Sequence, residues 1–202
     1  MVRLAASQAP DAARALALAF HDDPVMSWCF PRPDSRRRIL GAGFFLFLHR
    51  IWLPDGEAFA DPDVAGAACW LPPGRWHLPA RRRLALLPSL VGLARLRAPR
   101  FLRLMALVER KHPHAPHWYL PALGVRPQRQ GQGLGSRLMF PLLQRCDQQG
   151  LPAYLEASSP RNRALYECHG FEVTEELELP GNGPPLWLMW REPRKPGEQP
   201  GH

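Results

Sequence analysis

Apolar positions in the C-terminal half of the chain follow two periods, and turn residues separate the segments. Short apolar runs of strand length alternate with stretches in which apolar residues recur at helical spacing. The pattern predicts strands at 118–125, 152–157, 171–179 and 185–190, and helices at 133–149 and 160–169. Ser159 is expected to cap the second helix and Pro160 to open it, while Gly170 takes a left-handed conformation after its last turn.

The N-terminal half has fewer strand signals and is predicted to be mainly helical. Asp11 is expected to cap a helix that ends near His21, and a strongly apolar helix follows at 36–52. Two short strands are predicted at 58–60 and 65–71, before a Pro-Pro-Gly turn. At the other end of the chain, the tail at 191–202 is rich in Pro, Gly and charge, and is expected to be disordered.

The segment at 64–108 is distinguished by its charge. The chain has 26 basic and 18 acidic residues, a net charge of +8, and eight arginines with no other charged residue lie at 64–108. Two helices are expected here, divided from their neighbours by Pro88 and Pro99. In the second helix four apolar residues share one face: Phe101, Leu104, Met105 and Val108. Such helices pack their apolar face and present their arginines to solvent or to an anionic ligand.

Length and composition favour one compact domain. The chain has 202 residues, of which 46% are hydrophobic, enough to bury a core. Neither a secretory signal nor a bilayer-spanning segment is evident. Four widely spaced cysteines predict reduced thiols in a cytoplasmic protein: Cys29, Cys69, Cys146 and Cys168. The histidine run at 112–117 contains two prolines and no completing ligand set, so a rigid loop is expected and no metal.

A glycine-rich turn at 130–136 joins a strand to a helix. Glycines let an anion approach the backbone, and the positive end of the helix favours it, so a phosphate-bearing ligand is predicted. A phosphate-binding P-loop is excluded because the turn lacks its lysine. A dinucleotide site is disfavoured, since Ser136 replaces the third glycine and only 46 residues follow Glu156, the candidate ribose-binding acid.

Two motifs resemble the GNAT superfamily of acyl-CoA-dependent N-acetyltransferases. The first is a strand ending in Val125, then Pro127, then the run Gln130-Gly131-Gln132-Gly133-Leu134-Gly135 at the start of a helix. The second is Asn162, Tyr166 and the Gly170-Phe171 turn. Within the superfamily, the region from Trp118 to Trp190 is similar to the puromycin N-acetyltransferases, whereas the upstream half has little likeness.

The resemblance implies one α/β domain over residues 1–192. Its sheet would be mixed, mostly antiparallel and splayed at the centre, with helices on both faces. Residues 1–117 would form the acceptor side and residues 118–192 the acetyl-CoA-binding half. Acetyl-CoA is then the co-substrate, with no metal, no membrane and little role for nucleic acid; the chain would be a monomer or a homodimer.

The resemblance also implies roles for individual residues. The expected acetyl-CoA-binding residues are Leu123, Gly124, Val125, Gln130, Gly131, Gln132, Gly133, Leu134, Gly135, Ser136, Asn162 and Tyr166. Tyr166 would also give a proton to the departing thiolate.

For residues of the acceptor side, the sequence leaves more than one role open. Glu156, at a strand end, is the candidate general base, unless it pairs with Arg161 or Arg163; His117 and Asp22 or Asp23 are the reserves. Trp28, Trp118 and Tyr119 are candidates to line the acceptor pocket, or are core residues.

The expected activity is transfer of an acetyl group to a primary amine of a small molecule, by direct attack in a ternary complex. Antibiotic-like or aminonucleoside acceptors are included in this class. Two alternatives stay open: acetylation of a protein or peptide, and a catalytically silent domain that binds an anionic partner through its arginines.

Overall fold

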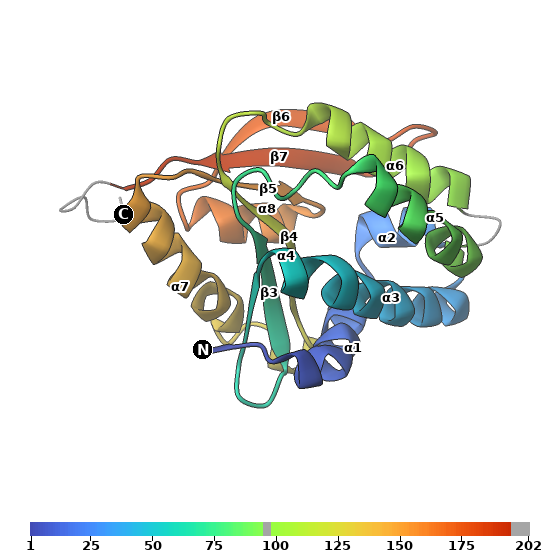
Figure 1. The fold of residues 1–202 in the computed structure, drawn as a ribbon, viewed down its shortest axis with the longest axis horizontal. Helices are drawn as coiled ribbons and strands as arrows, with labels where there is room; N and C mark the ends of the chain where they lie inside the picture. Colours follow the sequence, from blue (N-terminus) through green and yellow to red (C-terminus); the bar gives the residue numbers. More distant parts are fainter. Residues whose placement is uncertain (95–97, 195–202) are drawn as a thin grey trace.

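The computed structural model describes residues 1–94 and 98–194. One seven-stranded sheet runs through this part of the chain in the order β1-β2-β3-β4-β5-β7-β6. All neighbouring strands are antiparallel except β4 and β5, which are parallel. Helices cover both faces: α7 lies on one side, and α3, α5 and α6 gather on the other (Figure 1).

The chain divides into an N-terminal half that is rich in helices and a C-terminal half in which strands and helices alternate. The first half comprises β1 (Val2–Arg3), α1 (Ala9–Ala19), α2 (Pro24–Cys29), α3 (Pro33–Phe47), the π-helical turn η2 (Leu48–Trp52), α4 (Leu53–Asp55), β2 (Glu57–Ala60), β3 (Gly66–Leu71), α5 (Ala80–Ala94) and α6 (Ala98–Lys111). The second comprises β4 (Trp118–Val125), the 3-10 turn η4 (Pro127–Arg129), α7 (Leu134–Gln149), β5 (Ala153–Ala157), α8 (Pro160–Glu167), β6 (Glu172–Glu178) and β7 (Pro185–Arg191).

The sheet opens at its centre, between β4 and β5. These strands pair only at their first residues, where Trp118 lies opposite Ala153 and Tyr119 opposite Tyr154. Beyond Tyr119, β4 pairs with β3 and β5 pairs with β7, so a wedge separates the two parallel strands. The predicted central splay is therefore confirmed. The wedge leaves one edge of β4 free for hydrogen bonding to a ligand.

A β-bulge in β4 lies at the narrow end of the wedge, directly after Tyr119. Cys69 is opposite Ala122 and Leu71 is opposite Tyr119, so Trp70 alone faces the two residues Leu120 and Pro121. Proline suits this place because a bulge needs no ladder hydrogen bond from it. Beyond the bulge, α1 packs directly on the strand: a Cβ at Gly124 would lie 2.9 Å from side-chain atoms of both Leu16 and Ala19.

The core consists of three clusters of buried side chains. One lies between the sheet and α7, and includes Leu138, Leu155 and Tyr166. The second lies under α1, and the third lies between β5–β7 and the helices α2 and α6. The site described below lies where the three clusters adjoin the wedge.

The predicted strands and C-terminal helices agree with the structure to within a residue or two at most ends. Ser159 accepts a hydrogen bond from the backbone N–H of Asn162 and caps α8 as expected. Gly170 has φ +84°, in the left-handed region.

In the N-terminal half one helix cap was predicted wrongly, and one predicted helix is present but begins earlier. Asp11 does not cap α1: the cap is Gln8, because the helix begins before Pro10, and Asp11 lies in its first turn. The helix predicted at 36–52 begins at Pro33 and becomes π-helical after Phe47.

The predictions about Pro88 and about the start of the C-terminal tail were also wrong. Pro88 does not divide two helices but lies inside α5. The tail does not begin at Arg191, which belongs to β7 and is only 2% exposed. The remaining prediction of disorder falls mainly on 195–202, outside the described residues.

Candidate active site

The glycine turn places free backbone N–H groups at the open end of the wedge. Gly131 and Gly133 have φ values of +75° and +70°, a conformation that a side chain would strain. Gly133 is the N-terminal cap of α7, so the first N–H groups of this helix have no intrahelical acceptor. Together with the positive end of the helix dipole, these donors form a cradle for an anion.

The side chain of Gln130 links this turn to β4 and α8 by hydrogen bonds. Its side-chain Nε2 donates to the backbone oxygen of Val125 at 2.9 Å, and its Oε1 accepts from Arg161 of α8 at 3.0 Å. A Cβ at Gly135 would lie 3.4 Å from the Leu165 side chain and 4.0 Å from that of Leu123. The start of α7 therefore packs against both α8 and β4. Ser136 bonds to His169 at 2.9 Å, and Asn162 is half-buried in the first turn of α8.

Tyr166 is positioned by α8 with its ring in the core. The residue is 6% exposed, and the ring meets that of Phe171 edge to face at 5.9 Å. Burial raises the pKa of Tyr166 above its usual range, and the negative charges of Asp23 and Glu156 raise it further. The phenol is therefore protonated at neutral pH.

Glu156 lies on β5 at the point where the wedge opens. Its Oε2 accepts a hydrogen bond of 2.9 Å from the Tyr119 hydroxyl, on the neighbouring strand. Its Oε1 is buried and has no hydrogen-bond partner in the described residues. His112 approaches this oxygen, with Nδ1 3.8 Å away. The alternative of a pair with Arg161 or Arg163 is not observed, since Arg161 bonds to Gln130 and Arg163 to Glu167.

Two buried histidines extend from Glu156. Nε2 of His112 and Nε2 of His117 are 3.0 Å apart, and Nδ1 of His117 is 2.6 Å from the backbone oxygen of Ala115. Burial lowers the pKa of His117, and the neighbouring His112 lowers it further, so His117 is neutral at neutral pH. Its Nδ1–H donates to Ala115, and its Nε2 accepts from His112. The sequence named His117 but missed His112, because their contact is made only when the loop folds onto β4.

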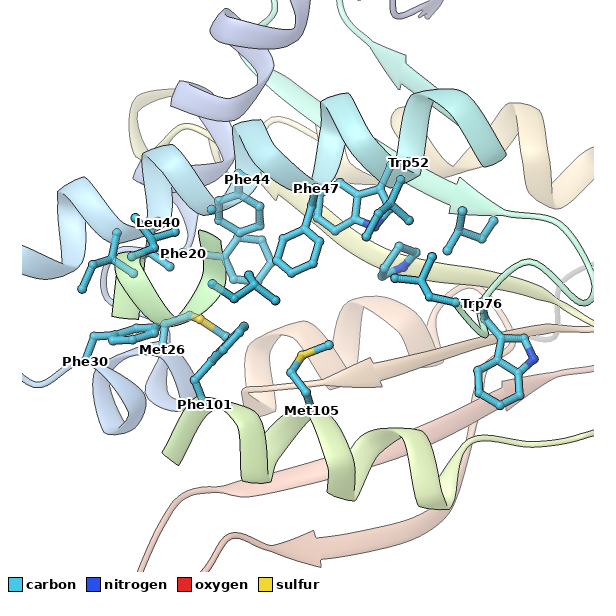
Figure 2. Close-up of a pocket in the computed structure, with 18 of the residues that line it drawn as sticks. Phe20, Met26, Phe30, Leu40, Phe44, Phe47, Trp52, Trp76, Phe101 and Met105 are labelled. Atoms are coloured by element: carbon cyan, nitrogen blue, oxygen red, sulfur yellow. The ribbon is translucent and has the colours of Figure 1, made fainter. Parts of the chain in front are cut away.

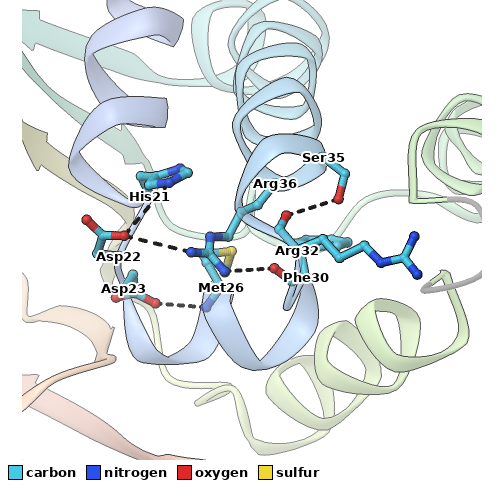
Figure 3. A network of polar contacts seen from close by, with 8 residues as sticks. All are labelled: His21, Asp22, Asp23, Met26, Phe30, Arg32, Ser35 and Arg36. Carbon is cyan, nitrogen blue, oxygen red and sulfur yellow. Dashed lines mark hydrogen bonds and ion pairs between the residues drawn. The ribbon is translucent and has the colours of Figure 1, made fainter.

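The reserve carboxylates have other partners. Asp23 is buried, caps α2 by accepting from the N–H groups of Val25 and Met26, and accepts from the Ser158 hydroxyl. Burial raises the pKa of Asp23 although these hydrogen bonds lower it. Asp22 is exposed and lies 3.7 Å from the buried Arg36, which donates to the Phe30 oxygen (Figure 3). Asp22 and Asp23 thus hold the loop between α1 and α3 in place.

Residues 20–171 match the sequence profile of the Acetyltransferase (GNAT) family. The chain belongs to the GNAT acetyltransferase family.

Individual relatives agree with this assignment. An uncharacterised N-acetyltransferase from Schizosaccharomyces pombe is 32% identical over 205 residues, covering 95% of this chain and 82% of the relative. A structure of histone acetyltransferase HPA2 and related acetyltransferase from Corynebacterium glutamicum has a TM-score of 0.72 at 25% identity, covering 98% of this chain and 97% of the other. The polyamine N-acetyltransferase of Drosophila melanogaster, which forms N-acetylagmatine, shares the fold with a TM-score of 0.63 at 17% identity, covering 94% and 97%.

Members of the GNAT family use acetyl-CoA as co-substrate, and the features of this acetyltransferase fit that molecule. The cradle at Gly131–Ser136 suits a pyrophosphate, and the free edge of β4 suits the amide-bearing pantetheine arm. The described residues contain no group of three or more side chains suited to a metal ion. Within the same residues, every helix is too short or too polar to cross a membrane. The likeness to puromycin N-acetyltransferases stays a prediction.

The three aromatic residues predicted to line the acceptor pocket of this acetyltransferase fall in different places. Trp118 faces α7, is 6% exposed and donates to Gln149, so it is a core residue. Trp28 lies under the guanidinium of Arg100, 4.9 Å from its ring centre. Tyr119 alone lines the cavity described next.

A cavity of about 230 Å³ lies in the N-terminal half of the acetyltransferase and at β4, between α3, α6 and that strand. Side chains of α3, among them Phe44 and Phe47, point across it toward Phe101 and Met105 of α6, and Trp76 lies at one end (Figure 2). The sequence predicted the apolar face of α6 but not that α3 would face it, because that contact joins segments more than 50 residues apart.

Proposed function

We propose that the chain is an acetyl-CoA-dependent N-acetyltransferase that transfers an acetyl group to a primary amine of a small molecule. The observation that supports this most directly is the carboxylate of Glu156. One oxygen is held by Tyr119, and the other is buried, unpartnered and close to the wedge. A buried carboxylate oxygen with a free lone pair is suited to accept a proton from an incoming amine.

The acetyl-CoA-binding residues are proposed from the cradle and the wedge. The N–H groups from Gly131 to Ser136 would hold the pyrophosphate, and the backbone of Leu123, Gly124 and Val125 would align the pantetheine arm. The half-buried Asn162 would bond to a pantetheine amide. Gln130 would act by holding the turn against Val125, consistent with its hydrogen bonds to both sides.

In the proposed reaction the neutral amine attacks the thioester carbonyl carbon directly. A carbon–nitrogen bond forms, the carbon–sulfur bond breaks, and Glu156 takes one proton from the nitrogen. Tyr166 supplies a hydrogen bond, and finally a proton, to the departing sulfur. Because a phenolate is a stronger base than a thiolate, this proton moves late, and the proton held by Glu156 restores the phenol. No acyl-enzyme intermediate is required.

The alternative of a silent domain that binds nucleic acid through its arginines has weaker support. Arg82 bonds to Asp55 at 2.5 Å and Arg83 to Glu109 at 2.6 Å. Arg100 donates to the Trp28 oxygen at 2.8 Å. Three arginines of the basic stretch thus have partners within the chain and would have to give them up to bind phosphate.

A thiol-release assay with purified protein, acetyl-CoA and a panel of amines tests the proposal. Aminonucleosides, arylalkylamines, polyamines and peptides with a free N-terminus should be included. We expect thiol release that depends on one class of amine, and acetyl-CoA binding detectable by calorimetry. Absence of acetyl-CoA binding at millimolar concentration, or amine-independent thiol release only, would overturn it.

A further inference from the structure

We infer that the acceptor is a monoamine with an uncharged apolar body, aromatic or branched, and that this body fills the cavity between α3, α6 and β4. The inference rests on the proposed function and specifies its substrate class. Three properties of the cavity support it: its lining, its connection to Glu156 and its access to solvent.

Among the described residues the lining is apolar and uncharged. Its walls come from helices of the N-terminal half and from the bulged part of β4, and none of the described lining residues is Asp, Glu, Lys, Arg or His. An apolar cavity of ~150 Å³ is enough to bind benzene, so about 230 Å³ accommodates a ring and a short linker. Apolar pockets of this kind bind ligands chiefly by removing apolar surface from water.

Two lining side chains connect the cavity to the candidate base. The ring of Tyr119 lines the cavity, while its hydroxyl donates to Glu156 at 2.9 Å. Trp76 also lines the cavity and stacks on His112 with ring centres 4.0 Å apart. His112 in turn lies 3.8 Å from the unpartnered oxygen of Glu156. Glu156 itself does not line the cavity but lies directly beyond Tyr119. An acceptor bound there would have its body in the cavity and its amino group past Tyr119, at the carboxylate.

One lining residue of α6 is also exposed to solvent. Met105 lines the cavity and is 41% exposed. Its side chain therefore lies between the cavity and solvent, which is where an entrance would be. A small molecule could therefore enter without unfolding the helical layer.

The absence of charge among the described lining residues distinguishes monoamines from other acceptors. The second cation of a polyamine or the guanidinium of agmatine would enter the cavity without a carboxylate, and an unpaired buried charge is strongly unfavourable. A peptide would bring backbone amides, and the Tyr119 hydroxyl already donates to Glu156. Both classes should be acetylated poorly, although a structural relative forms N-acetylagmatine.

The test compares kcat/KM for 2-phenylethylamine, agmatine and a tripeptide with a free N-terminus, at saturating acetyl-CoA. We expect 2-phenylethylamine to exceed the other two by at least tenfold. If agmatine or the peptide is the better acceptor, the enzyme is an acetyltransferase but this inference is wrong. If no amine raises thiol release, the proposed acetyltransferase function itself is wrong.

A charge introduced at the entrance provides the matched comparison. Met105→Glu places a carboxylate at the cavity, whereas Leu84→Glu makes the same change at a residue of α5 that is 70% exposed and does not line it. We expect Met105→Glu to lower kcat/KM for 2-phenylethylamine about tenfold. The ratio of kcat/KM for 2-phenylethylamine to that for agmatine should also fall, while KM for acetyl-CoA stays unchanged. Leu84→Glu should change neither kcat/KM for 2-phenylethylamine, nor this ratio, nor KM for acetyl-CoA. Equal effects of both variants would overturn the inference.

Discussion

The Tyr119 hydroxyl donates to Glu156 across the only parallel strand pair of the described sheet, over 2.9 Å. The two residues are 37 positions apart in the chain. Their contact joins the acceptor cavity, which Tyr119 lines, to the wedge, where Glu156 presents its free oxygen. Burial raises the pKa of Tyr119 well above its usual range, and the charge of Glu156 raises it further, so the donor keeps its proton.

Replacing the candidate base should remove most of the activity without affecting co-substrate binding. General base catalysis contributes roughly 10²–10⁴-fold, so Glu156→Gln is expected to lower kcat by ~10²-fold or more. Calorimetry should find unchanged acetyl-CoA affinity. The control is Glu176→Gln, because Glu176 also accepts from an aromatic donor, Trp187 at 2.9 Å, on the edge strand β6. Equal activity of the two variants would exclude Glu156 as the base.

Removing the Tyr119 hydroxyl should have a smaller effect of the same kind. Tyr119→Phe leaves the charged Glu156 without its donor, and hydrogen bonds to charged groups are worth ~1.5–3 kcal/mol, so we expect kcat to fall at least tenfold. Thr174→Val is the control, because it removes a hydroxyl that donates to the Leu188 oxygen at 3.1 Å on the edge strand β6. Steady-state kinetics check this: a loss of kcat in Thr174→Val as large as in Tyr119→Phe would contradict the assignment.

The glycine cradle can be tested with two glycines that differ only in position. Gly131 has φ +75° and Gly150, at the other end of α7, has φ +64°; neither would bring a Cβ within 4 Å of another residue. Alanine at either should cost ~1 kcal/mol of stability through the same backbone strain. We expect only Gly131→Ala to weaken acetyl-CoA binding measured by calorimetry, by tenfold or more. Similar affinities would mean that the turn does not hold the co-substrate.

Local signals explain why the C-terminal half was predictable. Ser159 and Gly170 mark the ends of α8 through their own side chain and backbone, and β4 has the predicted bounds. Pro88 shows the limit of such rules. The carbonyl four residues before it belongs to Leu84, which is 70% exposed, so water can replace the hydrogen bond that proline removes.

The site was predictable only where a motif carried it. The turn at Gly131 and the residue Tyr166 belong to motifs contained within a few positions. Glu156 was identified as a candidate, but its partner was expected to be a neighbouring arginine and is instead Tyr119. His112 was missed. These contacts depend on the pairing of β4 with β5, which residue spacing does not encode.

Another prediction concerns stability and the buried Arg191. Asp147 accepts both guanidinium hydrogen bonds of Arg191, at 2.7 and 2.9 Å. Burial raises the pKa of Asp147, but the bonds from Arg191 and from the N–H of Arg194 outweigh it and leave this pKa below its usual value. Removing one partner of a buried pair costs ~3–5 kcal/mol; since the Asp147 side chain is 28% exposed, we expect Asp147→Asn to cost about 2 kcal/mol.

The pH dependence of that loss has a definite sign. A carboxyl whose pKa is lowered by folding stabilises the protein above its unfolded value, ~3.9, and the stabilisation disappears as pH falls through the folded value. Urea unfolding at pH 7 should therefore separate wild type from Asp147→Asn, and the two should converge below about pH 4. A difference that persists undiminished at low pH would show that the pair does not act through charge. Asp63→Asn, at a carboxylate that is 77% exposed, is the control.

The buried His117 leads to a second prediction, that stability also depends on pH at higher pH. Here folding disfavours the protonated form of a base, whereas at Asp147 it favours the ionised form of an acid. Burial lowers the pKa of His117 and also that of His169, so the folded protein resists protonating either ring. The unfolded chain binds these protons below ~6.5, and stability must then fall as pH decreases from about 7 toward the lowered values, by up to ~1.4 kcal/mol per pH unit for each group. Thermal unfolding between pH 8 and pH 5 measures this slope. His117→Gln should lower the melting temperature at pH 8 yet give a shallower slope; an unchanged slope would mean that His117 is not held neutral by the fold.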